Sequence, residues 1–250
     1  MNVEWIRTRC REVATRAAAA TLSLLYPPHC AACQRDTEAG VHLCEFCSCD
    51  VRPIVPPFCE KCSQPFDGAI DGDFTCANCA DRAFHFDYAV APFLSRGVVR
   101  DYIHGFKYDR KLHLRHQLAD WMQVGLQDRR LTERGIDAIV PVPLHPARKR
   151  EREFNQAEVL ASLLGKRMAV PVEDCLQRTR YTTTQTRFDR HERMENLRGA
   201  FRVRHTAVVT GRHLILIDDV FTTGSTVEAC ARVLRAAGAA SVRVLTVARG

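Results

Sequence analysis

The segment Leu214–Thr226 reads LILIDDVFTTGST and places an apolar run, two acids and a small polar turn in direct succession. The apolar run Leu214–Ile217 is too short for a helix and unbroken on both faces, which is typical of a parallel strand covered by helices. We expect this strand to end at Asp218 and Asp219. The segment VEACARVLRAA after the turn has the pattern of an amphipathic helix.

The turn Thr222–Thr226 has the chemistry of a phosphate site. Gly224 permits a tight bend without a Cβ, so that successive N–H groups converge on one point. The helix that follows adds free amides and the positive end of its dipole. Two adjacent acids repel a phosphate, but they accept hydrogen bonds from hydroxyls. The pattern therefore predicts a ribose 5-phosphate site, because a helix cap alone needs neither two acids nor five small polar residues.

This segment resembles the phosphoribosyl pyrophosphate (PRPP) motif of the type I phosphoribosyltransferases over its full length. The resemblance implies that Asp218 and Asp219 bind the ribose hydroxyls and are the catalytic acids of an active enzyme. It also implies that the 5′-phosphate is surrounded by Thr222, Thr223, Gly224, Ser225 and Thr226, and that Mg²⁺ accompanies PRPP. The chain has neither GxxxxGK[ST] nor a GxGxxG after a strand, which excludes the rival phosphate loops.

Eight of the twelve cysteines form four CxxC pairs before residue 80. Each pair presents two thiolates from one turn, and two pairs complete a tetrahedral zinc site. We expect two structural Zn²⁺ sites, each contributing on the order of 10 kcal/mol to folding. Their ligands are Cys30, Cys33, Cys44, Cys47, Cys59, Cys62, Cys76 and Cys79. Sequential pairing, with the first four on one ion, is the simplest; an interleaved pairing uses the same residues.

The size and charge of the chain indicate a soluble, cytoplasmic protein with an anionic ligand. Its 250 residues are 46% hydrophobic, enough for one or two packed domains. No apolar run approaches the ~20 residues that span a bilayer, so no transmembrane segment is expected, and there is no secretory signal. The net charge is +7, and residues 145–205 hold 14 Lys or Arg against 8 Asp or Glu. A polyanion is expected to bind there.

A second strand, Ile139–Pro143, leads into a basic loop. Because ligands gather at the carboxyl ends of parallel strands, we expect Arg150 and Arg152 to bind the pyrophosphate of PRPP. A helix is expected to begin at Phe154-Asn155-Gln156. Lys107, at the turn between two helices predicted over Gly97–Trp121, is a further candidate for contact with PRPP.

The zinc knuckles, Lys107-Tyr108, the segment VPVPLHPARKREREFNQAEVLA and the PRPP motif together resemble the ComF family of competence-associated, amidophosphoribosyltransferase-like proteins. The resemblance covers nearly the whole chain. It implies an N-terminal helix over 1–26, a double zinc ribbon over 27–82 and a phosphoribosyltransferase-like domain over 83–250. The fold class is then α/β, a parallel sheet flanked by helices in the type I phosphoribosyltransferase fold. Where the family usually has glycine, this chain has Glu153, which we expect to weaken pyrophosphate binding through shape and charge.

Residues Leu176–Phe201 are rich in arginine and lack a hydrophobic period, which indicates a mobile basic loop or a short exposed helix. In phosphoribosyltransferases such a loop closes over the reaction centre. Its family-like positions in this chain are Gln185, Arg193 and Asn196.

The resemblance implies that the protein binds PRPP or a related ribose 5-phosphate. It also implies a role in natural transformation, in which single-stranded DNA and proteins of the DNA-uptake apparatus are the expected partners. The alternative is an active phosphoribosyltransferase of nucleotide metabolism, in which a nucleophile displaces pyrophosphate from ribose C1. Mg²⁺, Arg150 and Arg152 would then stabilise the leaving group. No nucleophile and no aromatic clamp for a nucleobase can be assigned from the sequence.

Overall fold

The computed structural model describes residues 28–38, 41–70, 72–180, 197 and 199–250. The chain divides into two compact units, one ending at Asp50 and the other spanning Val51–Gly250. The helix expected over 1–26 lies outside the described residues. No helix in the described part has the length and apolar character needed to cross a membrane.

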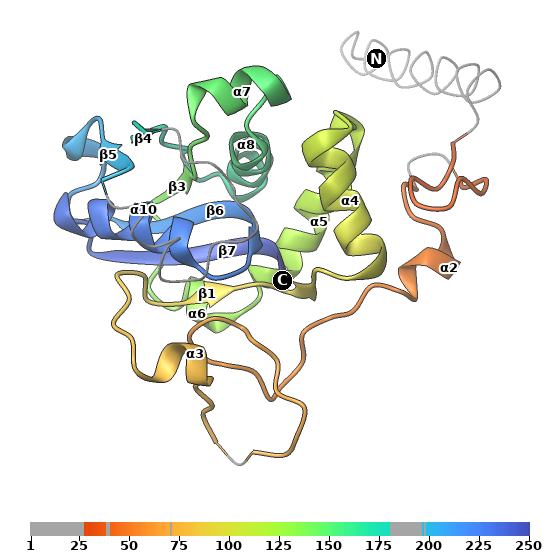
Figure 1. Ribbon diagram of the computed structural model, residues 1–250, viewed down its shortest axis with the longest axis horizontal. Coiled ribbons are helices and arrows are strands. Elements are labelled where there is room, and N and C mark those ends of the chain that lie inside the picture. The colour runs from red at the N-terminus through yellow and green to blue at the C-terminus, as the bar shows by residue number, and fades with distance from the viewer. Residues whose placement is uncertain (1–27, 39–40, 71, 181–196, 198) are drawn as a thin grey trace, which may run out of the picture. The chain divides into compact units, whose positions relative to one another are not determined.

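The larger unit is built on a parallel sheet of order β1-β7-β6-β3, in which β2 also pairs with β7 (Figure 1). The strands are β1 (Ala89–Val90), β2 (Phe93–Leu94), β3 (Ala138–Pro141), β6 (His213–Phe221) and β7 (Ser241–Arg249). Leu214 on β6 lies between Ala138 of β3 and Val242 of β7. The apolar run of the PRPP motif is therefore a central buried strand, and the predicted α/β class with a parallel sheet is confirmed.

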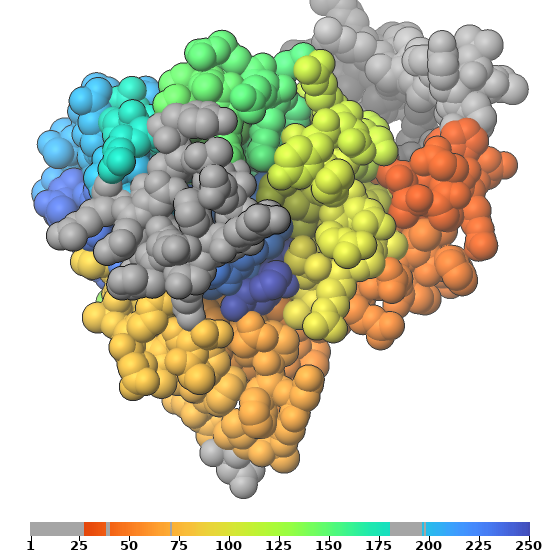
Figure 2. Space-filling view, in the orientation of Figure 1, coloured from red at the N-terminus to blue at the C-terminus, as the bar shows by residue number. Residues whose placement is uncertain are grey.

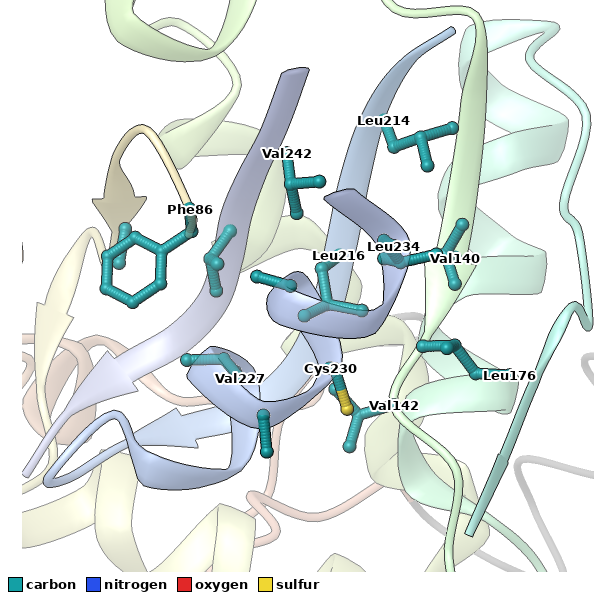
Figure 3. Packing of buried hydrophobic residues seen from close by; sticks show 14 of the residues in the cluster. Phe86, Val140, Val142, Leu176, Leu214, Leu216, Val227, Cys230, Leu234 and Val242 are labelled. Carbon is teal, nitrogen blue, oxygen red and sulfur yellow. The ribbon is translucent and has the colours of Figure 1, made fainter. Parts of the chain in front are cut away.

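One face of this sheet is covered by α10 (Ser225–Ala236). Its residues Val227, Cys230 and Leu234 lie at helical spacing and pack against Leu214 and Leu216 of β6 (Figure 3). The pair of short antiparallel strands β4 (Leu176–Arg178) and β5 (Phe201–Val203) borders the same layer. The packing of this apolar stripe on the sheet thus positions the start of α10, which adjoins the polar turn.

The other face is covered by α4 (Gly97–Tyr108), α5 (Arg115–Gly125) and α8 (Gln156–Met168). A Cβ on Gly125 would lie 2.7 Å from Leu245 Cδ1, so α5 packs closely on β7. Arg167 of α8 pairs with Asp120 of α5 at 2.8 Å. In Figure 2 the green surface of the segment that holds α7 and α8 lies beside the yellow-green surface of α4. The two helices predicted over Gly97–Trp121 and the helix after Asn155 are confirmed.

Two predictions about irregular segments are wrong, the second of them only at the two ends of its segment. The basic loop after β3 is a helix, α7 (Pro146–Arg152), because His145 caps it by accepting from the N–H of Ala147 and proline suits its first position. The ends of Leu176–Phe201 are the strands β4 and β5, whose residues Leu176 and Phe201 are buried in the core. The positions between them, 181–196 and 198, lie outside the described residues and include Gln185, Arg193 and Asn196.

The second cysteine ribbon belongs to the larger unit. It contains α3 (Ala77–Ala80), and the N–H of Ala89 on β1 donates to the carbonyl of Lys61 at 2.9 Å. The Ser63 hydroxyl donates to the carbonyl of Ala89. The first ribbon, with α2 (Glu45–Ser48), belongs to the smaller unit. The remaining short helices are η1 (Leu112–Leu114), α6 (Arg129–Thr132) and η2 (Thr206–Val208).

Candidate functional site

The two acids of the motif lie within β6, which continues to Phe221. The prediction that the strand ends at the acids is therefore wrong. The reason is the neighbouring strand β7, which pairs with β6 as far as Phe221↔Arg249. On the other side β3 pairs with β6 only as far as Pro141↔Ile217. The acids thus lie beyond the last residue of β6 that pairs with β3, and among the described residues no strand pairs with β6 on that side beside them.

Asp218 follows the alternation of Leu214 and Leu216 and therefore faces α10. Burial and the adjacent Asp219 carboxylate raise the pKa of Asp218 to about 7, although Lys107 and Arg178 oppose the shift. One Asp218 oxygen accepts the N–H of Asp219 at 2.9 Å. Burial and Asp218 in turn raise the pKa of the Cys230 thiol in α10. Asp218 is accordingly a carboxyl group that changes charge near neutral pH.

Asp219 faces the opposite side of the sheet, where Lys107 at the end of α4 binds it. The Lys107 Nζ lies 2.8 Å from Asp219 Oδ1, and the two side chains are only 19% and 10% exposed. Burial alone would lower the pKa of Lys107, but the charge and hydrogen bond of Asp219 raise it overall. The structure therefore brings together two of the predicted site residues that are far apart in the sequence, as a buried ion pair.

The turn after β6 forms a small cavity of about 40 Å³, lined by Asp218, Val220, Phe221 and residues 222–227. Gly224 has φ of 76°, and a Cβ there would lie 2.6 Å from Phe221 Cζ. Glycine is required at this position by both conformation and space. Gly224 also caps α10 without a side chain, so the first turn of the helix keeps amides that face the cavity.

The residues at the end of β7 hold Phe221, the last residue of β6 before the turn. The Arg249 guanidinium lies 5.2 Å from the centre of the Phe221 ring, and its Nη1 donates to the Phe221 carbonyl at 3.0 Å. The N–H of Gly250 donates to the same carbonyl. In the turn itself the hydroxyls of Thr223 and Ser225 lie 2.9 Å apart. The sequence did not single out Arg249, because nothing in the motif shows which residue supports it.

The two arginines predicted to bind pyrophosphate point in different directions. Arg152 stacks on the Tyr108 ring, 4.9 Å from its centre, and donates to Gln156 Oε1 at 3.2 Å. Arg150 lines a larger cavity of about 560 Å³ between α7, α8 and β4. The other cations of that cavity are Lys149, Arg178 and Arg204. Sequence reasoning missed Arg178, whose place on a strand was hidden in the arginine-rich segment.

Glu153 stands where the family resemblance led us to expect glycine, and its backbone conformation is one that favours glycine. It ends α7 with φ of 69°, in the left-handed region. A side chain in that region is strained. The Glu153 carboxylate pairs with Arg110 at 2.6 Å, with both side chains exposed, and it also lines the larger cavity. The substitution therefore puts a negative charge where the pyrophosphate was expected.

The eight predicted metal ligands form two clusters in the sequential pairing, which is confirmed. Within each cluster the sulfur atoms lie within 4.8 Å of one another. Cys33 and Cys44 Sγ are 3.6 Å apart, and Cys62 and Cys76 Sγ are 3.8 Å apart. A tetrahedron with Zn–S bonds of about 2.3 Å has edges of about 3.8 Å, so both clusters fit Zn²⁺. The second cluster is fully buried, whereas Cys33 in the first is exposed.

Comparisons with known proteins agree with this arrangement. The chain matches the family model of the double zinc ribbon domain over residues 21–82 and that of the phosphoribosyl transferase domain over residues 155–250. It is 32% identical over 217 residues to the DNA utilization protein YhgH of Escherichia coli strain K12. It is 27% identical over 211 residues to competence protein F of Haemophilus influenzae. Each alignment covers 83% of this chain and 90% of the relative.

Among solved structures, the glutamine PRPP amidotransferase from B. subtilis, complexed with ADP and GMP, is similar in fold. The TM-score is 0.40 at 20% identity, and the match covers 58% of this chain and 30% of that one. The adenine phosphoribosyltransferase from Leishmania tarentolae matches with a TM-score of 0.34 at 14% identity, over 55% of this chain and 58% of that one.

Proposed function

The chain belongs to the ComF family, which includes competence protein F and the DNA utilization protein YhgH, and we propose that it binds PRPP or a related ribose 5-phosphate and takes part in the handling of single-stranded DNA during natural transformation. One observation carries the ligand proposal: Asp218 and the whole turn Thr222–Thr226 line the same cavity. Groups that can donate hydrogen bonds to a phosphate thus lie beside a carboxylate that can accept them from ribose hydroxyls.

The cavity is too small to hold a ribose, so only the phosphate would enter it. At about 40 Å³ it is little larger than one water molecule's share of liquid volume, about 30 Å³. The amides of the first turn of α10, the helix dipole and the hydroxyls of Thr223 and Ser225 would hold the phosphate there. The ribose would then lie outside the cavity, along the β3 side of β6.

The two carboxylates would bind the ribose from that side. Asp218 and Asp219 point to opposite faces of the sheet, but no β3 residue pairs with β6 beyond Ile217. To contact both, the ligand would have to lie against this side of β6. Asp219 is oriented by Lys107, and both acids are hard oxygen ligands suited to Mg²⁺ bound with the diphosphate. Arg150 in the larger cavity would contact the diphosphate, against the opposing charge of Glu153.

Calorimetric titration of PRPP with Mg²⁺ tests this site. Asp218→Asn keeps the shape of the side chain and leaves the Lys107–Asp219 pair intact, and Asp101→Asn on the exposed face of α4 is the matched control. We expect the first variant to bind at least ten-fold more weakly, with zinc content unchanged, and the control to bind as the parent does. Equal affinity of Asp218→Asn and the parent would refute the site.

The pH dependence of binding gives a second readout of the same site. A carboxylate accepts hydrogen bonds from hydroxyls, whereas a protonated carboxyl is a poorer acceptor, and the pKa of Asp218 is raised to about 7. Affinity for PRPP should therefore rise as pH increases from 6 to 8. The Asp218 contribution to this rise should be missing in Asp218→Asn, and an identical pH profile in both proteins would contradict the assignment.

The proposal for DNA rests on the charge of residues 145–205, 14 basic against 8 acidic. Phosphate contacts made by such a segment release counterions, so affinity for single-stranded DNA should fall steeply between about 50 and 200 mM salt. Fluorescence anisotropy of a labelled oligonucleotide measures this slope. Binding that does not change with salt would contradict contact through this segment.

An active phosphoribosyltransferase is the second candidate, because the cavity of about 560 Å³ between α7, α8 and β4 is large enough for an acceptor molecule. If pyrophosphate is released from PRPP when a nucleobase is added in the presence of Mg²⁺, the result favours the enzyme. Absence of release with the common purines and pyrimidines would favour the binding protein.

A further inference from the structure

A second charged cavity lies at the other end of β7, where the strand begins, and the turn after β6 does not contribute to it. Its volume is about 350 Å³, and its lining comes from the second ribbon, the two residues before β1, the segment around α6 and the first residues of β7. All these parts belong to the larger unit. The cations in the lining are Lys61, Arg130, Arg134 and Arg243.

The acids around this cavity do not balance those cations. Asp87 lines the cavity, but its Oδ1 lies 2.6 Å from Nη2 of Arg235, and Arg235 does not line the cavity. Arg130 is neutralised by Asp128, whose Oδ2 lies 2.6 Å from its Nη2. Without these two engaged groups, three cations, Lys61, Arg134 and Arg243, face two acids, Glu60 and Glu133. The cavity therefore keeps an excess of positive charge.

Arg243 is the least compensated of these groups. Its side chain is 2% exposed. Two of its nitrogens donate to the carbonyls of Leu131 and Gly135, and its Nε is buried without a hydrogen-bond partner. No carboxylate of the described residues lies within ion-pair distance of it. Buried charges and buried donors are normally paired, so this arginine marks a place for an acceptor. Burial also lowers the pKa of its guanidinium.

Lys61 is a second cation in the lining, and its side chain is partly buried. Its ammonium donates to the carbonyls of Phe86 and Asp87 at 2.8 and 2.7 Å, which uses two of its three donors. Within the described part of the chain, no carboxylate forms an ion pair with it. Lys61 lies between the zinc ligands Cys59 and Cys62, so a ligand beside it would contact the second ribbon directly.

We infer that this cavity binds a small anion that carries a phosphate group. Its volume falls in the range of small-molecule sites and accommodates a nucleotide. Tyr88 offers an aromatic ring and Thr75 a hydroxyl in the same lining. A bound anion would neutralise both Lys61 of the second ribbon and Arg243 of β7, and it would thereby add a contact between the ribbon and the sheet. This site is separate from the turn after β6 and does not depend on the function proposed for that turn.

Inorganic phosphate is the first probe, titrated calorimetrically into the zinc-loaded full-length chain. Gly224→Ala serves as the background, because it distorts the turn and suppresses phosphate binding there. In this background we expect Lys61→Met to weaken binding ten-fold or more and Arg134→Gln to weaken it several-fold. The matched control Arg129→Gln changes an exposed arginine of α6 that does not line the cavity, and its affinity should be unchanged.

The proposal is overturned if the Gly224→Ala protein binds no phosphate, or if Arg134→Gln and Arg129→Gln bind it equally well. Arg134 is exposed, so its replacement should leave the fold intact. The Arg134→Gln variant therefore tests phosphate binding in this cavity even if Lys61→Met loses zinc. Repeating the titration with AMP shows whether the anion is a nucleotide. Tighter binding of AMP than of phosphate, lost in Arg134→Gln, is the result that we expect.

Discussion

The buried pair of Lys107 and Asp219 allows a quantitative test of how the site is held. The charges are 2.8 Å apart. At an effective dielectric constant of about 20 their attraction is on the order of 6 kcal/mol, from which the cost of removing both groups from water must be subtracted. Removing one partner of such a pair costs about 3–5 kcal/mol, because the other charge is left buried. We therefore expect Lys107→Met to lower the free energy of unfolding by about 3 kcal/mol.

Urea denaturation at pH 8 measures this loss, and a double-mutant cycle with Asp219→Asn isolates the pair. The sum of the losses of unfolding free energy in the two single variants should exceed the loss in the double variant by about 2 kcal/mol. Lys111→Met is the matched control: Lys111 pairs with Asp109 at 3.6 Å, but the side chains are 45% and 49% exposed, so it should cost less than about 1 kcal/mol. Additive single losses, or equal losses for the two lysine variants, would refute a buried, coupled pair.

Four further variants probe the diphosphate region, the turn and the two metal centres. Glu153→Gly removes a strained side chain and a negative charge, so calorimetry should show several-fold tighter PRPP binding and a stability within about 1 kcal/mol of the parent. Gly224→Ala puts a residue with a Cβ in the left-handed region and against Phe221, so it should weaken PRPP binding at least ten-fold and cost about 1–3 kcal/mol of stability. Cys76→Ser should lose one zinc and destabilise the larger unit, whereas Cys33→Ser should lose one zinc and leave the melting of that unit unchanged, as zinc assay and scanning calorimetry would show.

The parts of the fold that the sequence predicted are those that local pattern determines. The apolar run of β6, the stripe of Val227, Cys230 and Leu234 on α10, and the spacing of the CxxC pairs each carry their own signal. The pairing of the cysteines could be stated only as the simplest choice, because spacing alone permits an interleaved arrangement. The structure resolves it through sulfur positions.

The parts that the sequence did not predict depend on contacts between distant segments. The length of β6 is set by its register with β7, and the short strand β4 is recognisable only through its pairing with β5. The contact of Lys107 with Asp219 has no signal in either local sequence. For α7 a local signal was present, since His145 before Pro146 is a helix start, but the run of basic residues suggested a loop.

The central claim is that the carboxylates of β6 bind ribose hydroxyls while the adjacent turn binds the 5′-phosphate. Titration of ribose 5-phosphate and of 2-deoxyribose 5-phosphate into the zinc-loaded chain tests it most directly, since the two ligands share the phosphate and differ in one hydroxyl. A hydrogen bond to a charged group contributes about 1.5–3 kcal/mol, so we predict that the ribose compound binds at least ten-fold more tightly. Equal affinity for the two sugars would contradict the account.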